Sequence, residues 1–158
     1  ITREGLKALW QKRRKFFSLS GKEKALFTEA LLLHLWVGLA LKVIPFRKIP
    51  VIFRSPLFGL KAESEAKSRH PLSGQQYDLI RLIKDAVTRA GNVSPWKNKC
   101  LVSSLAGRCM LRSRKIPSEL SLGVIKGAEG KVAAHAWLES GGVEIVEKGG
   151  DYTAMYRF

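Results

Sequence analysis

The spacing of apolar residues changes along the chain from a helical repeat to the alternation of β-strands, and the change falls near residue 120. Upstream of this point, helices are predicted over residues 3–17, 20–43, 73–91 and 99–114. Downstream, strands are predicted over residues 120–126, 132–139 and 143–147, with Gly-containing turns between them. Helices followed by an antiparallel meander predict an α+β fold.

Capping boxes mark two of the predicted helix starts. Ser20 with Glu23 and Ser73 with Gln76 have the spacing in which a Ser hydroxyl and a Glu or Gln side chain satisfy each other's backbone N–H groups. The centre of the first of these helices, residues 30–41, is almost entirely apolar, but a membrane span needs about 20 such residues. We therefore expect a core helix in which His34 is a structural histidine.

The chain has 158 residues, of which 46% are hydrophobic, and this suits one domain with a real core and a helical extension. Four prolines, at positions 45, 50, 56 and 71, interrupt the middle of the chain. The predicted organisation is a basic helical N-terminal region at 1–60, a linker at 61–74 and a catalytic domain at 75–158.

Positive charge is concentrated in the first part of the chain. The net charge is +15, and residues 1–61 carry 13 Lys and Arg against 3 Asp and Glu. Such a surface favours acidic partners, which include nucleic acid, an anionic membrane touched peripherally, and an acidic peptide, although it also serves simple solubility. We expect no nucleic acid among the partners, because aromatic and basic residues are interleaved only at residues 10–17. No Walker loop, no GxGxxG and no metal-ligand spacing is present, so we expect neither a nucleotide cofactor nor a metal.

The two cysteines, Cys100 and Cys109, lie nine residues apart on one predicted helix. That spacing puts them on opposite faces and about 13–14 Å apart along the helix axis, which no disulfide spans. With no disulfide and no signal-peptide pattern, the cytoplasm is the expected location.

Cys100 and His135 form the candidate site. Cys100 falls in the first turn of its helix, where the dipole and unpaired N–H groups stabilise a thiolate, and Lys97 and Lys99 add positive charge. His135 lies mid-strand between two alanines, which leave room for a helix to approach. A thiol with a histidine base within reach can carry out acyl transfer or proteolysis. Cys109 points the other way and is expected to be a core residue.

A third group must orient the histidine. The strand that follows His135 in the predicted meander offers Glu144 and Glu147, and Asp151 comes shortly after it. An acid on that strand could reach the imidazole, and the choice among the three depends on the register of the hairpin.

Several segments resemble the leader peptidases of lasso-peptide biosynthesis, the transglutaminase-like family whose type member processes microcin J25. The resemblance covers residues 92–158 and extends weakly to the N-terminal helices. Its segments are Trp96–Ala106, Leu111–Pro117, Leu122–Lys126 and Ala134–Glu139 with Gly142, preceded by Glu29–Leu33 and Ile44–Phe46.

The resemblance implies a papain/transglutaminase-like fold and a cysteine protease that removes a leader from a ribosomally made precursor peptide. Cys100 would be the nucleophile and His135 the general base and acid. The family has an aspartate about twelve residues after this histidine, and Glu147 stands there, one methylene longer. The backbone N–H of Cys100, together with Asn98 or Trp96, is our expectation for the oxyanion donors.

The resemblance also implies partners. A separate small leader-recognition protein would present the precursor, because residues 1–60 hold no winged-helix-like domain, and an ATP-dependent macrolactam synthetase would act next. Two other functions remain open. One is transglutaminase-like acyl transfer to an amine, and the other is a non-enzymatic basic adaptor that binds nucleic acid or a membrane.

Overall fold

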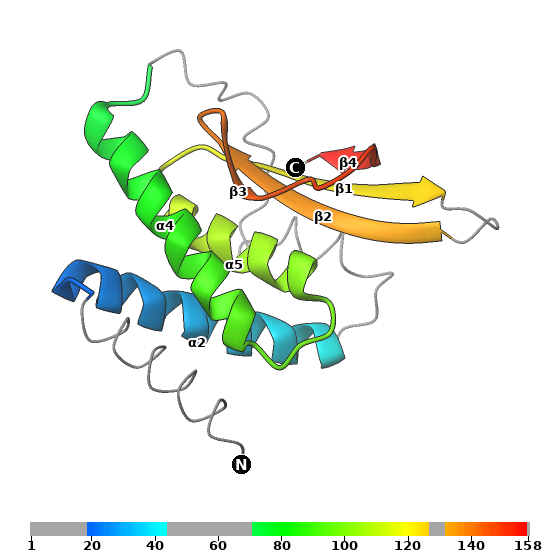
Figure 1. Cartoon of the computed structure of the whole chain (residues 1–158), viewed down its shortest axis with the longest axis horizontal. Coiled ribbons are helices and arrows are strands. Elements are labelled where there is room, and N and C mark those ends of the chain that lie inside the picture. The colour runs from blue at the N-terminus through cyan, green and yellow to red at the C-terminus, as the bar shows by residue number, and fades with distance from the viewer. Residues whose placement is uncertain (1–18, 44–70, 127–131, 158) are drawn as a thin grey trace, which may run out of the picture.

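The computed structural model describes residues 19–43, 71–126 and 132–157. Over these residues the chain forms three helices and then four strands (Figure 1), which confirms the predicted α+β class. In chain order they are α2 (Gly21–Val43), α4 (Gly74–Val93), α5 (Lys99–Ser113), β1 (Glu119–Lys126), β2 (Val132–Ser140), β3 (Val143–Val146) and β4 (Thr153–Arg157). The helix predicted at 3–17 and the turn predicted at 127–130 lie outside the described residues.

Both predicted capping boxes are present. The Ser20 N–H donates to Glu23 Oε2 at 2.8 Å, and the Glu23 N–H donates back to Ser20 Oγ at 3.3 Å. Ser73 and Gln76 make the same reciprocal pair at the start of α4, at 2.9 and 3.3 Å. These local bonds satisfy backbone donors that the first helical turn leaves unpaired, so both helices begin where the sequence predicts.

The molecule is built in three layers. α4 and α5 pack on one face of the sheet, and α2 packs on α4 and α5 from the far side. A single core runs through all of them and includes Val37 of α2, Ile83 of α4, Leu105 of α5 and Leu138 of β2. Helix α2 therefore shares its core with the C-terminal elements. The predicted linker at 61–74 lies mostly outside the described residues, so the domain boundaries stay a prediction.

Helix α2 has two unlike faces. Its buried face carries Ala30, His34 and Val37 against α4 and α5, as expected for a core helix. Its outer face exposes large apolar side chains such as Leu32 and Leu39. By length and composition alone α2 could cross a membrane, and it is the one helix among the described residues of which this is true.

The four strands are antiparallel in the order β3-β2-β1-β4, so consecutive strands β3 and β4 lie at opposite edges. The connection between them, residues 147–152, must therefore cross the sheet, and we call it the crossover loop. It crosses the face away from the helices, because Leu138 on the other face meets Gly107 of α5 while Lys148 lies over the Trp137 ring. Strand β4 was not predicted from the sequence.

Candidate active site

Cys100 lies in the first turn of α5, as predicted. Its side chain is half-buried and packs against the core. Asn98, the N-cap residue, makes no side-chain hydrogen bond to the helix end. The first-turn N–H groups have no partner further back along the helix, so they are available to an anion at this end.

His135 lies on β2, opposite Gly123 of β1. Its Nε2 lies 2.8 Å from the carbonyl oxygen of Glu147. A carbonyl oxygen can only accept, so Nε2 carries the proton and Nδ1 holds the lone pair that a general base requires. The Tyr152 ring, with its centroid 4.9 Å from that of the imidazole, packs against His135 from the crossover loop.

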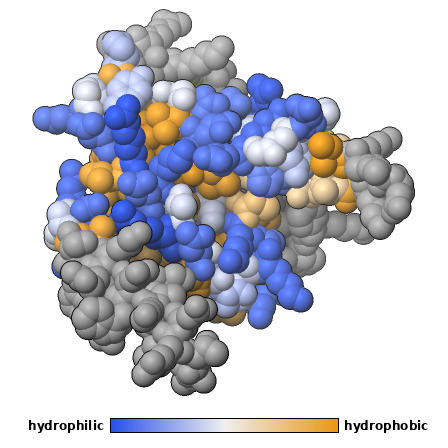
Figure 2. Space-filling model, in the orientation of Figure 1, coloured by the Kyte–Doolittle hydropathy of each residue, from blue (hydrophilic) through white to orange (hydrophobic). Residues whose placement is uncertain are grey.

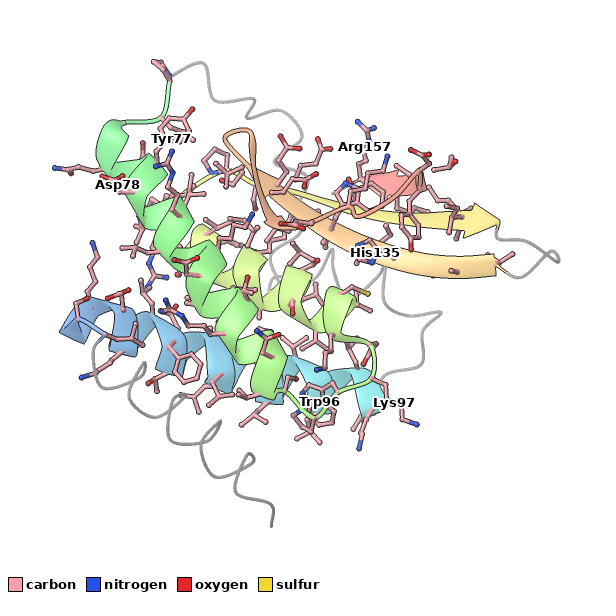
Figure 3. The ribbon with its side chains drawn as sticks, viewed as in Figure 1. Tyr77, Asp78, Trp96, Lys97, His135 and Arg157 are labelled. Atoms are coloured by element: carbon pink, nitrogen blue, oxygen red, sulfur yellow. The ribbon has the colours of Figure 1, made fainter. Side chains whose placement is uncertain are left out.

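Cys100 and His135 lie at about the same level along the contact between α5 and β2. The two elements run in the same direction (Figure 1), and Gly107 meets Leu138. Cys100 precedes Gly107 by about 10 Å of helix, and His135 precedes Leu138 by about 10 Å of strand. Figure 3 shows His135 toward the same end of the molecule as Trp96 and Lys97, which lead into α5.

The two reactive groups are not hydrogen-bonded to each other in the part of the chain that the structure describes. Ala136 and Leu138 face the core, so strand alternation places His135 with Trp137 on the face covered by the crossover loop. Among the described residues no hydrogen bond joins the Cys100 thiol to the imidazole, whose partners are the Glu147 carbonyl and the rings of Trp137 and Tyr152. The fold thus brings α5 and β2 together without a hydrogen bond between the sulfur and the imidazole.

Glu147 contacts the histidine through its main chain. We expected a carboxylate to orient His135, but the Glu147 carboxylate is exposed and pairs with Lys84 of α4 at 3.4 Å. The other two candidate acids make no recorded bond to His135 within the described chain. Glu144 lies opposite Glu139 in the β2–β3 register, and Asp151 is exposed on the crossover loop. The main-chain oxygen of Glu147 supplies the hydrogen bond, and the catalytic role of its carboxylate stays a prediction.

Aromatic and cationic side chains surround His135, and two of them, Lys148 and Tyr152, were not predicted from the sequence. Trp137 stacks on the imidazole with a centroid distance of 6.3 Å, and Lys148 Nζ lies 5.5 Å from the Trp137 ring. Gly123 provides the space, since a Cβ there would come within 2.9 Å of the same ring. The positions of Lys148 and Tyr152 depend on the crossover loop, for which the sequence carries no signal.

The remaining expectations concern nearby groups. Both cysteines are free thiols, as predicted. Burial raises the pKa of the Cys109 thiol, which disfavours its thiolate, but the side chain is only half-buried and, contrary to our expectation, is not part of the core cluster. The indole N–H of Trp96 already donates to the His34 carbonyl at 2.8 Å, so in this structure it is not an available oxyanion donor. Among the described residues no cluster of His, Cys, Asp or Glu could hold a metal ion.

A family comparison agrees with this arrangement. The family model of the transglutaminase-like superfamily matches residues 40–157, which cover α4, α5 and the whole sheet. The chain belongs to the transglutaminase-like superfamily. Cysteine peptidases and acyltransferases both belong to this superfamily, so the family match is consistent with either of these activities. No curated protein and no solved structure matches the chain.

Proposed function

We propose that this transglutaminase-like protein is a cysteine peptidase that removes the leader from a ribosomally made lasso-peptide precursor. The observation that carries the proposal is the placement of Cys100 in the first turn of α5, at the level of His135 on β2. The segments around both residues resemble the lasso-peptide leader peptidases, and this resemblance supports a precursor peptide as the substrate.

The chemistry would proceed in two acyl-transfer steps. The Cys100 thiolate attacks the scissile carbonyl after Nδ1 of His135 has taken the thiol proton. The resulting imidazolium donates that proton to the leaving amine, and a thioester remains on the enzyme. Water, deprotonated by Nδ1, then hydrolyses the thioester and releases the leader acid. The Glu147 carbonyl holds the ring in the tautomer that both steps need.

Strand alternation places His135 on the face that the crossover loop covers, so catalysis requires the ring to turn past the first residues of β2 toward the start of α5. Ala134 and Ala136 flank His135 with minimal bulk. Val132 at the start of the strand is exposed, and Figure 2 shows apolar surface at this end of the sheet. Hydrogen bonds between catalytic groups are commonly longer without substrate than in the reacting complex. A precursor bound at this apolar end would approach both residues.

The test is incubation with the cognate precursor and its recognition partner, with the products read by mass spectrometry. Cys100→Ala should abolish leader removal, and Cys109→Ala, the matched control on the same helix, should retain it. Equal activity of the two variants would refute the assignment. A product heavier by an amine in place of water would indicate acyl transfer instead.

The partners follow from the substrate and form part of the proposal. We infer that a separate small leader-recognition protein presents the precursor and that an ATP-dependent macrolactam synthetase uses the product, in the cytoplasm. Omission of the recognition protein should slow cleavage by the wild-type enzyme without affecting the requirement for Cys100.

A further inference from the structure

His34 is a buried histidine that the proposed reaction does not use. It lies on the inner face of α2 with an exposed fraction of 0%. Its Nδ1 is 2.7 Å from the Ala30 carbonyl, so Nδ1 carries the proton and donates. Its Nε2 therefore accepts, and the Ser103 hydroxyl donates to it across 3.0 Å. Burial lowers the pKa of His34, which keeps the ring neutral and this pattern intact.

The main chain of the same residue holds a second group. The Trp96 indole N–H donates to the His34 carbonyl at 2.8 Å. The Trp96 ring packs where a side chain at Gly38 would otherwise be, and Lys42 Nζ lies 5.1 Å from its centroid. Helix α2 thus holds the loop before α5 through a hydrogen bond, a close packing contact and a cation–π contact.

These two attachments bracket Cys100. Trp96 lies four residues before Cys100, in the loop that leads into α5, and Ser103 lies three residues after it, about one helical turn further along. His34 lies in a segment that precedes the residues matched by the superfamily model, which begin at 40. The part of α2 that precedes the matched region, which includes His34, is therefore bonded to both sides of the turn that carries the thiol.

We propose that His34 is a positioning residue for Cys100, which acts through Ser103 and Trp96 to fix the first turn of α5. The inference rests on the proposed role of Cys100 as nucleophile. A thiolate is stabilised by aligned first-turn N–H groups only while that turn keeps its geometry, and misplacement of a reacting group by about 1 Å can cost a hundredfold in rate.

Two adjacent serines provide the matched test. Ser103→Ala removes the partner of His34 Nε2, whereas Ser104→Ala removes a buried hydroxyl with no hydrogen-bond partner among the described residues. Alkylation of Cys100 by iodoacetamide, followed across pH by peptide mass spectrometry, reports the thiolate directly. Alkylation of Cys109 in the same sample serves as the internal reference, and thermal unfolding checks that each variant is folded.

Ser103→Ala should move the alkylation profile of Cys100 to higher pH and lower kcat about tenfold with little change in KM, because geometry and not substrate binding is lost. Ser104→Ala should stay within about twofold of wild type. His34→Gln, whose amide oxygen can still accept from Ser103, should preserve the profile better than His34→Leu.

Two results would overturn the inference. If Ser103→Ala and Ser104→Ala shifted the alkylation profile of Cys100 equally, general disturbance of the core would cause the effect. If Ser103→Ala left that profile unshifted, the first turn of α5 would not depend on the hydrogen bond to His34. Alkylation requires no substrate, so it decides this question even if Cys100→Ala leaves leader removal intact and the proposed function fails.

Discussion

At the scale of single residues, Glu147 binds His135 through its main-chain carbonyl, which a side-chain substitution leaves in place. The hydrogen bond is to the main-chain carbonyl, while the carboxylate pairs with Lys84 in an exposed setting. Glu147→Ala should therefore keep leader removal within about threefold of wild type and cost no more than about 1 kcal/mol of stability. Steady-state kinetics would check this.

His135→Ala is the control for that prediction, since it removes the base itself and should abolish turnover. A loss of about a hundredfold or more in kcat for Glu147→Ala would instead place the carboxylate in the reacting complex, as an acid does in thiol and serine triads.

The burial of His34 leads to a prediction of how the stability of the fold depends on pH. Burial lowers its pKa in the folded state below the ordinary value of 6.5. Below about 6.5 the unfolded state therefore binds the proton first, so stability is full above that pH and falls as the pH drops toward the folded pKa. Urea unfolding should show a loss of at most about 1.4 kcal/mol per pH unit in that window.

His34→Gln is the comparison, because it has no titrating ring at this position. Its free energy of unfolding should change less between about pH 7.5 and about pH 5.5 than that of wild type. Parallel curves for the two proteins would contradict the assignment of the acid sensitivity to His34.

At the scale of elements, the packing of α2 on the loop before α5 depends on a glycine. A Cβ at Gly38 would overlap the Trp96 ring, and the ring is held in place by its bond to the His34 carbonyl. Gly38→Ala should gain up to about 1 kcal/mol of helix propensity yet be destabilised overall by about 1–3 kcal/mol, because overpacking outweighs propensity.

Gly21→Ala provides the control at the start of the same helix, where a Cβ would meet nothing within 4 Å. Chemical denaturation of both variants would separate the two terms. If Gly38→Ala is as stable as Gly21→Ala, the Trp96 ring moves aside at little cost and the anchor is weaker than the distances indicate.

The elements also show what the sequence could predict. The boxes at Ser20 and Ser73 are local, since each is complete within four residues, and both helix starts were predicted correctly. Strand β4 is an edge strand with mostly exposed residues, so it lacks the alternation that marks a half-buried strand. Its pairing to β1 also shifts register at Gly123 and depends on a contact distant in sequence.

The candidate site likewise has some features that follow from local sequence and others that depend on tertiary contacts. Cys100 in a first turn and His135 on a strand follow from local patterns. The sheet face on which His135 lies depends on the packing of β2, and the atom of Glu147 that binds it depends on the path of the crossover loop. Both are tertiary facts, and sequence spacing alone cannot supply them.

At the scale of the whole molecule, the net charge of +15 predicts binding to polyanions that is independent of the thiol chemistry. Retention on heparin should be strong at low ionic strength and fall steeply as salt screens the charges, over a Debye length of about 8 Å at physiological salt. Cys100→Ala should elute with wild type. If retention on heparin did not change with salt concentration, the positive charge would not be the cause of binding.

The crossover loop has a consequence for how the sheet is completed during synthesis. Strand β1 is made before β2 and β3, yet its second neighbour is β4, which is the last of the described strands to be synthesised. Until then the nascent chain presents β1 as an open edge, with unpaired N–H and C=O groups that another chain could pair with. Residues 147–157 thus both cover the His135 face and pair with that edge, so a chain truncated before β4 should be prone to self-association.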